Sequence, residues 1–142
     1  MRLHVHLTFP GNCEEAFRFY ERVLGGTLSF LIRYGDSPAA VGAPAEFKDK
    51  VLHANIDVQN DALSGADSWE SHAARPANNF TLALEYSEVA EIERVFAALA
   101  EGGTVTLPLQ QTFWTTHFGM LTDRYGVPWM LNCTVAGSQA NN

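Results

Sequence analysis

The feature of this sequence that most constrains its fold is an internal repeat. The segment FYERVLGGTLSF begins at Phe19 and the segment FAALAEGGTVTL begins at Phe96, an offset of 77 residues. The same offset pairs the two Gly-Gly-Thr triplets that start at Gly25 and Gly102, and it also pairs Asn55 with Asn132. Identical positions are few, but the same kinds of segment recur in the same order on either side of both triplets. A repeat of this kind predicts two copies of one supersecondary unit.

The first copy begins with a strand at residues 4–9, where apolar and polar side chains alternate. A helix is predicted to follow, with Asn12 as its N-cap and Glu15 completing a capping box. An apolar stripe at helical spacing runs along this segment until Gly25, which we expect to end the helix in the left-handed conformation. Three further strands are predicted at residues 27–34, 51–58 and 62–66.

The second copy has the same order of elements. A strand at 80–86 precedes a helix that we expect Ser87 to cap and Gly102 to end. Strands then follow at residues 104–110, 117–123 and 127–133. Each half therefore has the order βαβββ, and the predicted fold class is α+β with two such modules.

The two modules are predicted to form a single domain over residues 1–142, a length typical of one domain. The expected boundaries are 1–67 for module one, 68–79 for a polar, Pro-containing linker, 80–135 for module two and 136–142 for a tail. Residues 35–49 are rich in Gly, Pro and Ala, so we predict a long mobile loop there, the usual place for a lid.

Charge and hydropathy exclude several classes of partner. The formal net charge of −7 argues against nucleic acid, because affinity for phosphates depends on Lys and Arg. No apolar run approaches the roughly 18 residues needed to cross a bilayer. The first residues lack the apolar stretch of a signal peptide, which favours a cytoplasmic location. Cys13 and Cys133 have no metal-binding spacing, and we expect two buried free thiols.

The last two predicted strands are joined by a tight turn. Asp123, followed by Gly126, is typical of turns in which a carboxylate accepts backbone N–H groups. Trp129 lies just beyond the turn, and we expect it to pack in the core or to line a cavity wall. This hairpin is therefore predicted to form a cavity wall.

Three segments together resemble the PhnB-like branch of the vicinal oxygen chelate superfamily, which includes glyoxalases, bleomycin-resistance proteins and extradiol dioxygenases. These segments are LTFPGNCEEAFRFYERVLGG, KVLHA and FWTTHFGMLTDRYGVPWMLNC. The resemblance implies two modules that curl into incomplete barrels around a cavity, usually in a homodimer. It also implies that metal enzymes of this superfamily hold a divalent ion with up to four side chains. One comes from the first strand and one from the last strand of each module.

At the positions that resemble these ligands, the offset of 77 residues matches His4 to Thr81 and His53 to Met130. An ungapped comparison of the first strand with glyoxalase-type sequences would instead place Val5 at the ligand position. Only the choice of His4 keeps the apolar face of that strand on the helix. A thioether and a neutral hydroxyl are poor ligands for a divalent ion. The resemblance thus points to an incomplete metal site, with His4 and His53 as the candidate ligands. A displaced cluster of His4, His6, His53 and Glu85 is the alternative.

Other polar residues of the predicted strands are candidates for binding or catalysis. His53 and Glu85 are the candidate catalytic residues, because either could move a proton in a partly buried site. A histidine satisfied by the backbone and a solvated glutamate are the structural alternatives. The candidate ligand-binding residues are His6, Asn55, Trp114, His117, Met130 and Asn132, of which the two asparagines could equally bridge strand ends.

Three functions follow from these residues. The first is a small-molecule-binding protein with an incomplete metal site and no assigned reaction. The alternative is a divalent-metal-dependent lyase, isomerase or dioxygenase that acts on a small substrate with vicinal oxygens. A third is a structural or partner-binding dimer with a vestigial cavity. The poor ligands at Thr81 and Met130 favour the first function over the second.

Overall fold

The computed structural model describes residues 1–38, 42–70, 75 and 79–134. They belong to two compact units, Met1–Arg75 and Pro76–Asn142, whose boundary lies inside the predicted linker at 68–79. Residue 135 and the predicted tail at 136–142 lie outside the described residues. No described helix is long and apolar enough to span a membrane.

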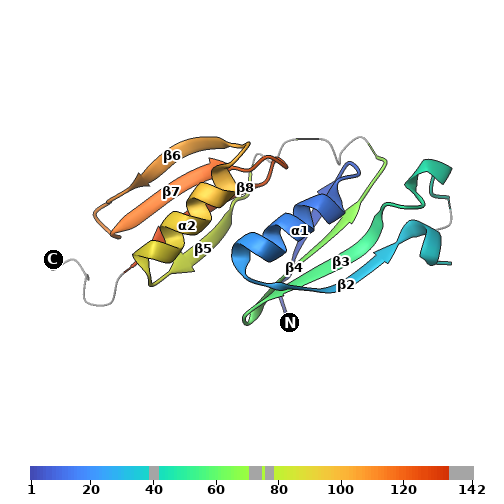
Figure 1. Cartoon of the computed structure of the whole chain (residues 1–142), viewed down its shortest axis with the longest axis horizontal. Coiled ribbons are helices and arrows are strands. Elements are labelled where there is room, and N and C mark those ends of the chain that lie inside the picture. The colour runs from blue at the N-terminus through green and yellow to red at the C-terminus, as the bar shows by residue number, and fades with distance from the viewer. Residues whose placement is uncertain (39–41, 71–74, 76–78, 135–142) are drawn as a thin grey trace. The chain divides into compact units, whose positions relative to one another are not determined.

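The first unit is a four-stranded sheet with one helix across it (Figure 1). Its strands bond in the order β1-β4-β3-β2, with β1 and β4 parallel and the other neighbours antiparallel. Parallel pairing of a first and last strand requires a long crossover, and the intervening elements supply it. The elements of the first unit, in chain order, are β1 (Val5–Phe9), α1 (Cys13–Leu24), β2 (Thr27–Arg33), β3 (Val51–Val58) and β4 (Asp61–Asp67).

The second unit repeats this topology. Its strands bond in the order β5-β8-β7-β6, and the first and last strands are again parallel. The predicted α+β fold of two βαβββ modules is therefore confirmed, and within the described residues neither sheet closes into a barrel. The elements are β5 (Leu82–Tyr86), α2 (Val89–Ala100), β6 (Thr104–Gln110), β7 (His117–Thr122) and β8 (Pro128–Cys133).

The repeat offset of 77 residues does not extend to the last strands, and the predicted match of His53 to Met130 is wrong. β4, not β3, is the last strand of the first module, because β4 pairs with β1 as β8 pairs with β5. Met130 lies beside Ala83 and Ser64 beside His6, so Ser64 is the structural counterpart of Met130. The offset changes because the β2–β3 connection, residues 34–50, is much longer than the β6–β7 connection, residues 111–116.

The pairing of Asn55 with Asn132 through the same offset is wrong for the same reason. Asn132 lies on β8 beside Glu85, whereas Asn55 lies on β3 beside Ser64. Thr8 lies beside Ala66, and Thr8 corresponds to Glu85 on the first strands, so Ala66 is the counterpart of Asn132.

Each helix covers one face of its own sheet and forms the core there (Figure 1). The fit is close in both units. A Cβ added to Gly65 would lie 2.6 Å from Cζ of Phe17, and one added to Gly119 would lie 2.7 Å from Cε2 of Phe96. Glycine in these strands therefore makes room for an aromatic side chain of the helix. The buried helix residues are Cys13, Ala16, Phe17, Phe19, Tyr20 and Val23 on α1, and Ile92, Val95, Phe96 and Leu99 on α2.

The long β2–β3 connection contains regular structure. It holds two short 3₁₀ helices, η1 (Tyr34–Asp36) and η2 (Ala45–Phe47), while residues 39–41 lie outside the described residues. The rings of Tyr34, Phe47 and Trp69 pack edge to face, with centroids 5.6 to 6.1 Å apart. The Tyr34 hydroxyl also donates to the backbone oxygen of Asp67 at 2.7 Å. These contacts tie the described part of this connection to the end of β4.

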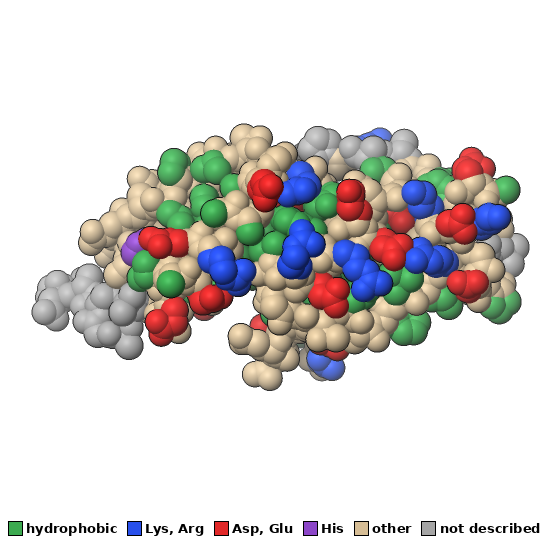
Figure 2. Space-filling view, in the orientation of Figure 1, with side chains coloured by type: hydrophobic (Ala, Val, Ile, Leu, Met, Phe, Trp, Pro, Cys, Tyr) green, Lys and Arg blue, Asp and Glu red, His purple; other side chains and the backbone are tan. Residues whose placement is uncertain are grey.

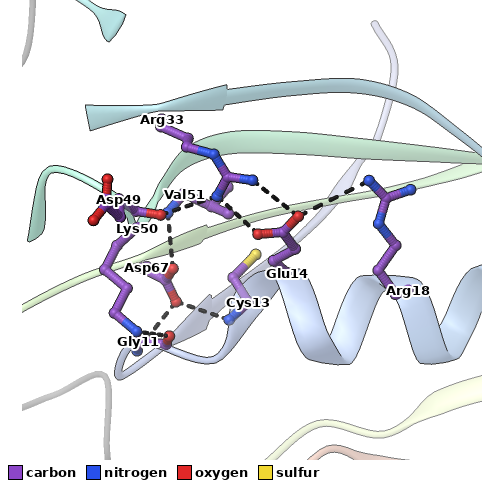
Figure 3. A network of polar contacts seen from close by, with 9 residues as sticks. All are labelled: Gly11, Cys13, Glu14, Arg18, Arg33, Asp49, Lys50, Val51 and Asp67. Carbon is purple, nitrogen blue, oxygen red and sulfur yellow. Dashed lines mark hydrogen bonds and ion pairs between the residues drawn. The ribbon is translucent and has the colours of Figure 1, made fainter. Parts of the chain in front are cut away.

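The N-terminus of α1 is held by Asp67, not by the predicted N-cap side chain. Asn12 occupies the N-cap position but makes no capping hydrogen bond through its side chain. Oδ1 of Asp67 accepts the backbone N–H groups of Gly11 at 3.1 Å and Cys13 at 2.9 Å (Figure 3). Its Oδ2 accepts the N–H of Val51 at 2.9 Å. One buried carboxylate thus joins the ends of β4, β3 and α1.

The second helix also begins differently from the prediction. Its N-cap is Glu88, one residue after the predicted Ser87, and no side-chain capping bond forms there. At the other end of the first helix, Gly25 adopts φ of 68°, which confirms the predicted left-handed termination.

The outer face of α1 carries an alternating set of charges, visible as neighbouring blue and red side chains in Figure 2. Arg18 lies 3.9 Å from Glu14 and 3.6 Å from Glu21. Glu14 is also bound by Arg33 of β2 through two hydrogen bonds of 2.7 and 3.0 Å (Figure 3). This pattern is typical of a solvated helix face.

The β7–β8 hairpin confirms the predicted turn chemistry. Oδ1 of the buried Asp123 accepts the backbone N–H groups of Tyr125 and Val127 at 2.8 and 3.0 Å. Its Oδ2 accepts the indole N–H of Trp129 at 2.9 Å. Trp129 is 1% exposed and belongs to the core on the α2 side of the sheet.

We predict that Asp67→Ala destabilises the protein by about 3 kcal/mol, because three backbone N–H groups lose a buried acceptor. Asn12→Ala should cost less than about 0.5 kcal/mol, below the roughly 1 kcal/mol of a working N-cap. Urea unfolding of both variants measures the difference. Asp61→Ala, an exposed change on the same strand, is the control. An Asn12→Ala loss equal to that of Asp67→Ala would contradict this account.

Candidate functional site

The face of the first sheet opposite α1 carries a polar cluster, here named the His6 face. It consists of His6, Phe30, His53, Asn55 and Ser64. Strand register places His6 beside Ser64, Ser64 beside Asn55, and Asn55 beside Phe30. Directly paired residues project to the same side of a sheet, so these side chains share one surface. Their strand neighbours, such as Leu7 and Ile56, face the helix and are buried.

Two histidines from different strands meet on the His6 face. The rings of His6 and His53 are nearly parallel, at an interplanar angle of 16° and a centroid distance of 5.9 Å. β4 lies between their strands and carries small side chains on this face, Ser64 and Ala66, so the two imidazoles can meet above it. The ring of Phe30, which is 50% exposed, lies 5.9 Å from that of His53. The structure therefore brings His53 together with His6.

Burial lowers the pKa of His6, and the neighbouring His53 lowers it further. His6 is thus neutral at pH 7, with one ring nitrogen as a donor and the other as an acceptor. Within the described residues neither His6 nor His53 makes a hydrogen bond. Their ring nitrogens are available to a ligand.

Asn55 is fully engaged within the sheet. Its amide nitrogen donates to Oγ of Ser29 at 3.0 Å and to Oδ1 of Asp57 at 2.8 Å. Its amide oxygen accepts the hydroxyl of Ser64 at 3.0 Å. These bonds link β2, β3 and β4 beside the histidines. The geometry gives Asn55 a positioning role on the His6 face.

The face of the second sheet opposite α2 carries a different set of side chains, here named the Glu85 face. It consists of Glu85, Phe118, Met120, Met130 and Asn132. Glu85 lies beside Asn132, and Asn132 lies beside Phe118. Met130 lies beside Met120 in the next row. Trp114, from the β6–β7 connection, packs its ring edge to face on Phe118 with centroids 5.5 Å apart.

Two predicted site residues lie apart from these clusters. His117 is paired with Cys133, which is buried on the α2 side of the sheet, so His117 faces that side rather than the Glu85 face. Its Nδ1 is buried and has no partner among the described residues. His4 precedes β1 and is exposed.

Four residues of the two faces were missed by the sequence reasoning, namely Phe30, Ser64, Phe118 and Met120. Met120 was assigned to a strand with no role. Ser64 lies in a predicted strand, but the wrong repeat offset removed that strand from the candidate site. Phe30 and Phe118 were assigned to strands with no role, since an aromatic residue in a strand is usually core.

Cys13 is not a reactive group, because burial, together with the charges of Asp67 and Glu14, raises the pKa of its thiol.

The donor groups present do not fit a resident divalent metal. Such a site needs three or more imidazole, carboxylate or thiolate ligands in one place. No group of three His, Cys, Asp or Glu side chains among the described residues could hold an ion. The His6–His53 pair supplies two imidazoles, and Ser64, the neighbour of His6, supplies only a hydroxyl that already donates to Asn55.

Comparisons with known proteins agree with this fold. The model of the Glyoxalase/Bleomycin resistance protein/Dioxygenase superfamily matches residues 2–131. Protein YjdN of Escherichia coli (strain K12) is 36% identical over 140 residues, which cover 93% of this chain and 95% of YjdN.

Two solved structures are similar over almost their whole length. Protein PA1353 from Pseudomonas aeruginosa is 44% identical, with a TM-score of 0.86 and coverage of 95% of this chain and 98% of PA1353. A PhnB protein from Bacillus cereus, named as a putative 3-demethylubiquinone-9 3-methyltransferase, is 27% identical, with a TM-score of 0.81 and coverage of 94% and 100%. The chain therefore belongs to the glyoxalase/bleomycin resistance protein/dioxygenase superfamily and is related to its PhnB-like proteins.

Proposed function

We propose that this protein binds a small oxygenated molecule on the His6 face without a resident metal ion. The observation that supports this proposal is the stacked pair of His6 and His53, whose ring nitrogens have no hydrogen-bond partner in the described residues. Imidazoles satisfied inside a protein would be expected to bond to the backbone or to a carboxylate. An unengaged pair on a sheet face suits a ligand with hydroxyl or carbonyl groups instead.

The surroundings of this pair favour a ligand with a flat ring. The half-exposed ring of Phe30 lies beside His53 and offers an apolar surface to a ligand. The bonds of Asn55 to Ser29, Asp57 and Ser64 hold the neighbouring strands in register. A ligand would thus meet a preorganised surface, which lowers the entropic cost of binding.

A metal-dependent lyase, isomerase or dioxygenase is the alternative function. It requires an ion that polarises vicinal oxygens of the substrate. The donor set described above does not complete such a site, so we derive no step through a metal.

We predict that catechol, a flat ring with two adjacent hydroxyl groups, binds at the His6 face of untagged, chelator-free protein. His53→Ala should weaken this binding by about 1–3 kcal/mol, the cost of losing a hydrogen-bond partner, with little loss of stability. Ile56→Ala, on the opposite face of the same strand, should instead cost about 2–5 kcal/mol of stability. NMR titration and thermal melts measure the two effects.

The same preparation separates the two functions by its metal content. The proposal expects far less than one divalent ion per chain. Stoichiometric metal, with catechol binding abolished by its removal, would favour the metal-dependent enzyme. If His53→Ala unfolds the protein, His53 is a core residue and the proposed face is wrong.

We predict that the histidine pair makes the folded state less stable in acid. The pKa of His6 is lowered by folding, so between that value and its ordinary value of about 6.5 the unfolded chain binds more protons. This contribution to stability is complete above pH about 6.5. It is lost as the pH falls through the pKa of His6 in the folded protein.

An NMR titration of the His6 ring gives its pKa directly. His53→Asn removes the neighbouring imidazole, so the pKa of His6 should rise while burial keeps it below the ordinary value. An unchanged His6 titration in this variant would show that the two rings do not interact.

We also propose that the protein is a homodimer. The described residues leave eight large apolar side chains exposed, and β1, β2, β5 and β6 lie at sheet edges. A second chain commonly covers such surfaces. The exposed side chains outside the two proposed ligand faces include Leu3 at 96%, Phe80 at 49%, Val105 at 42% and Phe113 at 86%.

Light scattering at micromolar concentration should give about twice the chain mass of 15.6 kDa. Val105→Ser and Phe113→Ser together should shift the mass toward that of one chain. A mass of one chain for the unmodified protein would contradict the dimer.

A further inference from the structure

We propose that the Glu85 face binds an aromatic amine in its protonated form. Glu85 and Asn132 would accept the ammonium N–H groups, and Phe118 with Trp114 would contact the ring. This surface lies in the second unit, in residues other than those of the His6 face, so it is tested separately from the catechol site.

The strand register places these groups in one row across the sheet. Glu85 of β5 lies beside Asn132 of β8, Asn132 beside Phe118 of β7, and Phe118 beside Gln110 of β6. Their side chains project away from α2, because the alternate residues Leu131 and Trp129 are buried beneath the helix. The row therefore presents a carboxylate, an amide and an aromatic ring in succession.

Two acceptors in this row have no donor. Glu85 is exposed and makes no ion pair with a described residue. Oδ1 of Asn132 is buried and accepts no hydrogen bond within the described part of the chain. An amide oxygen in this state carries a desolvation cost that a bound donor would relieve. Side by side, the two acceptors suit a ligand with several N–H donors.

The charge of the second unit favours a cation. Residues 76–142 contain six acidic and two basic residues. Both basic side chains are already engaged, since Arg94 pairs with Glu91 at 3.0 Å and Arg124 donates to the backbone oxygen of Glu101 at 3.1 Å. Neither is available to attract an anion to Glu85.

The aromatic part of the row explains why the amine should carry a ring. Phe118 is the direct neighbour of Asn132, and the half-exposed ring of Trp114 packs on it. Aromatic faces attract ammonium groups and stack with other rings. Met120 and Met130 supply an apolar surface in the adjoining row. An ammonium offers three N–H donors for the two acceptors, whereas an alcohol offers one O–H.

Three probes that share a phenethyl group test this proposal: phenethylammonium, 2-phenylethanol and 3-phenylpropionate. Each is titrated into ¹⁵N-labelled protein at pH 7 to about 10 mM, a range suited to fragments of this size. Phenethylammonium should shift the side-chain amide of Asn132 and bind about tenfold more tightly than 2-phenylethanol. 3-Phenylpropionate should give no saturable shift there.

Glu85→Gln should reduce the affinity for phenethylammonium by about tenfold and leave that for 2-phenylethanol unchanged. Glu93→Gln, on the exposed side of α2, removes the same charge elsewhere and should have little effect. Both variants should keep the spectrum of the folded protein, because both side chains are exposed.

Three results would overturn the proposal. They are equal binding of the amine and the propionate, an equal loss in Glu93→Gln and Glu85→Gln, or no saturable shift of Asn132 with the amine. Each leaves catechol binding at the His6 face unaffected, so failure here is distinct from failure of the proposed function.

Discussion

The first unit depends on one buried carboxylate. Asp67 lies at the end of β4 and binds backbone N–H groups at the start of α1 and of β3. A buried carboxylate is costly unless it is satisfied, and here three N–H donors satisfy it. Because it joins the last strand to the first turn of the helix, the carboxylate closes the crossover between the parallel strands β1 and β4. The position of α1 across the sheet follows from this connection.

A helix on one face of each sheet leaves the opposite face to other uses. In the first unit that face carries the imidazoles of His6 and His53 beside a hydrogen-bonded Asn55, and in the second it carries Glu85, Asn132 and aromatic rings. The same topology thus presents two surfaces with different chemistry. One suits ligands with hydroxyl or carbonyl groups, and the other suits donors of several N–H groups. The fold supports either chemistry because the core lies entirely on the helix side.

The sequence reasoning succeeded where the physics is local and failed where a distant segment intervenes. The alternation of residues 4–9 and the left-handed Gly25 depend only on neighbours along the chain. The Asp123 turn was also predictable, because its carboxylate binds N–H groups within four residues. The predicted N-cap bond of Asn12 did not form, and Asp67, far along the chain, instead accepts the N–H groups of Gly11 and Cys13 at the start of the helix. No pattern around Asn12 indicates this acceptor.

The sequence by itself determined the two βαβββ modules, the polar side of each strand and the candidates His6, His53, Glu85 and Asn132. Periodicity and glycine positions are sufficient for these, since they reflect backbone geometry. Only the tertiary structure decided which candidates meet. It joined His53 to His6, placed His117 on the helix side of its sheet and made Ser64, not His53, the counterpart of Met130. Strand order and register control these neighbours, and both depend on connections of unequal length that a repeat in sequence does not reveal.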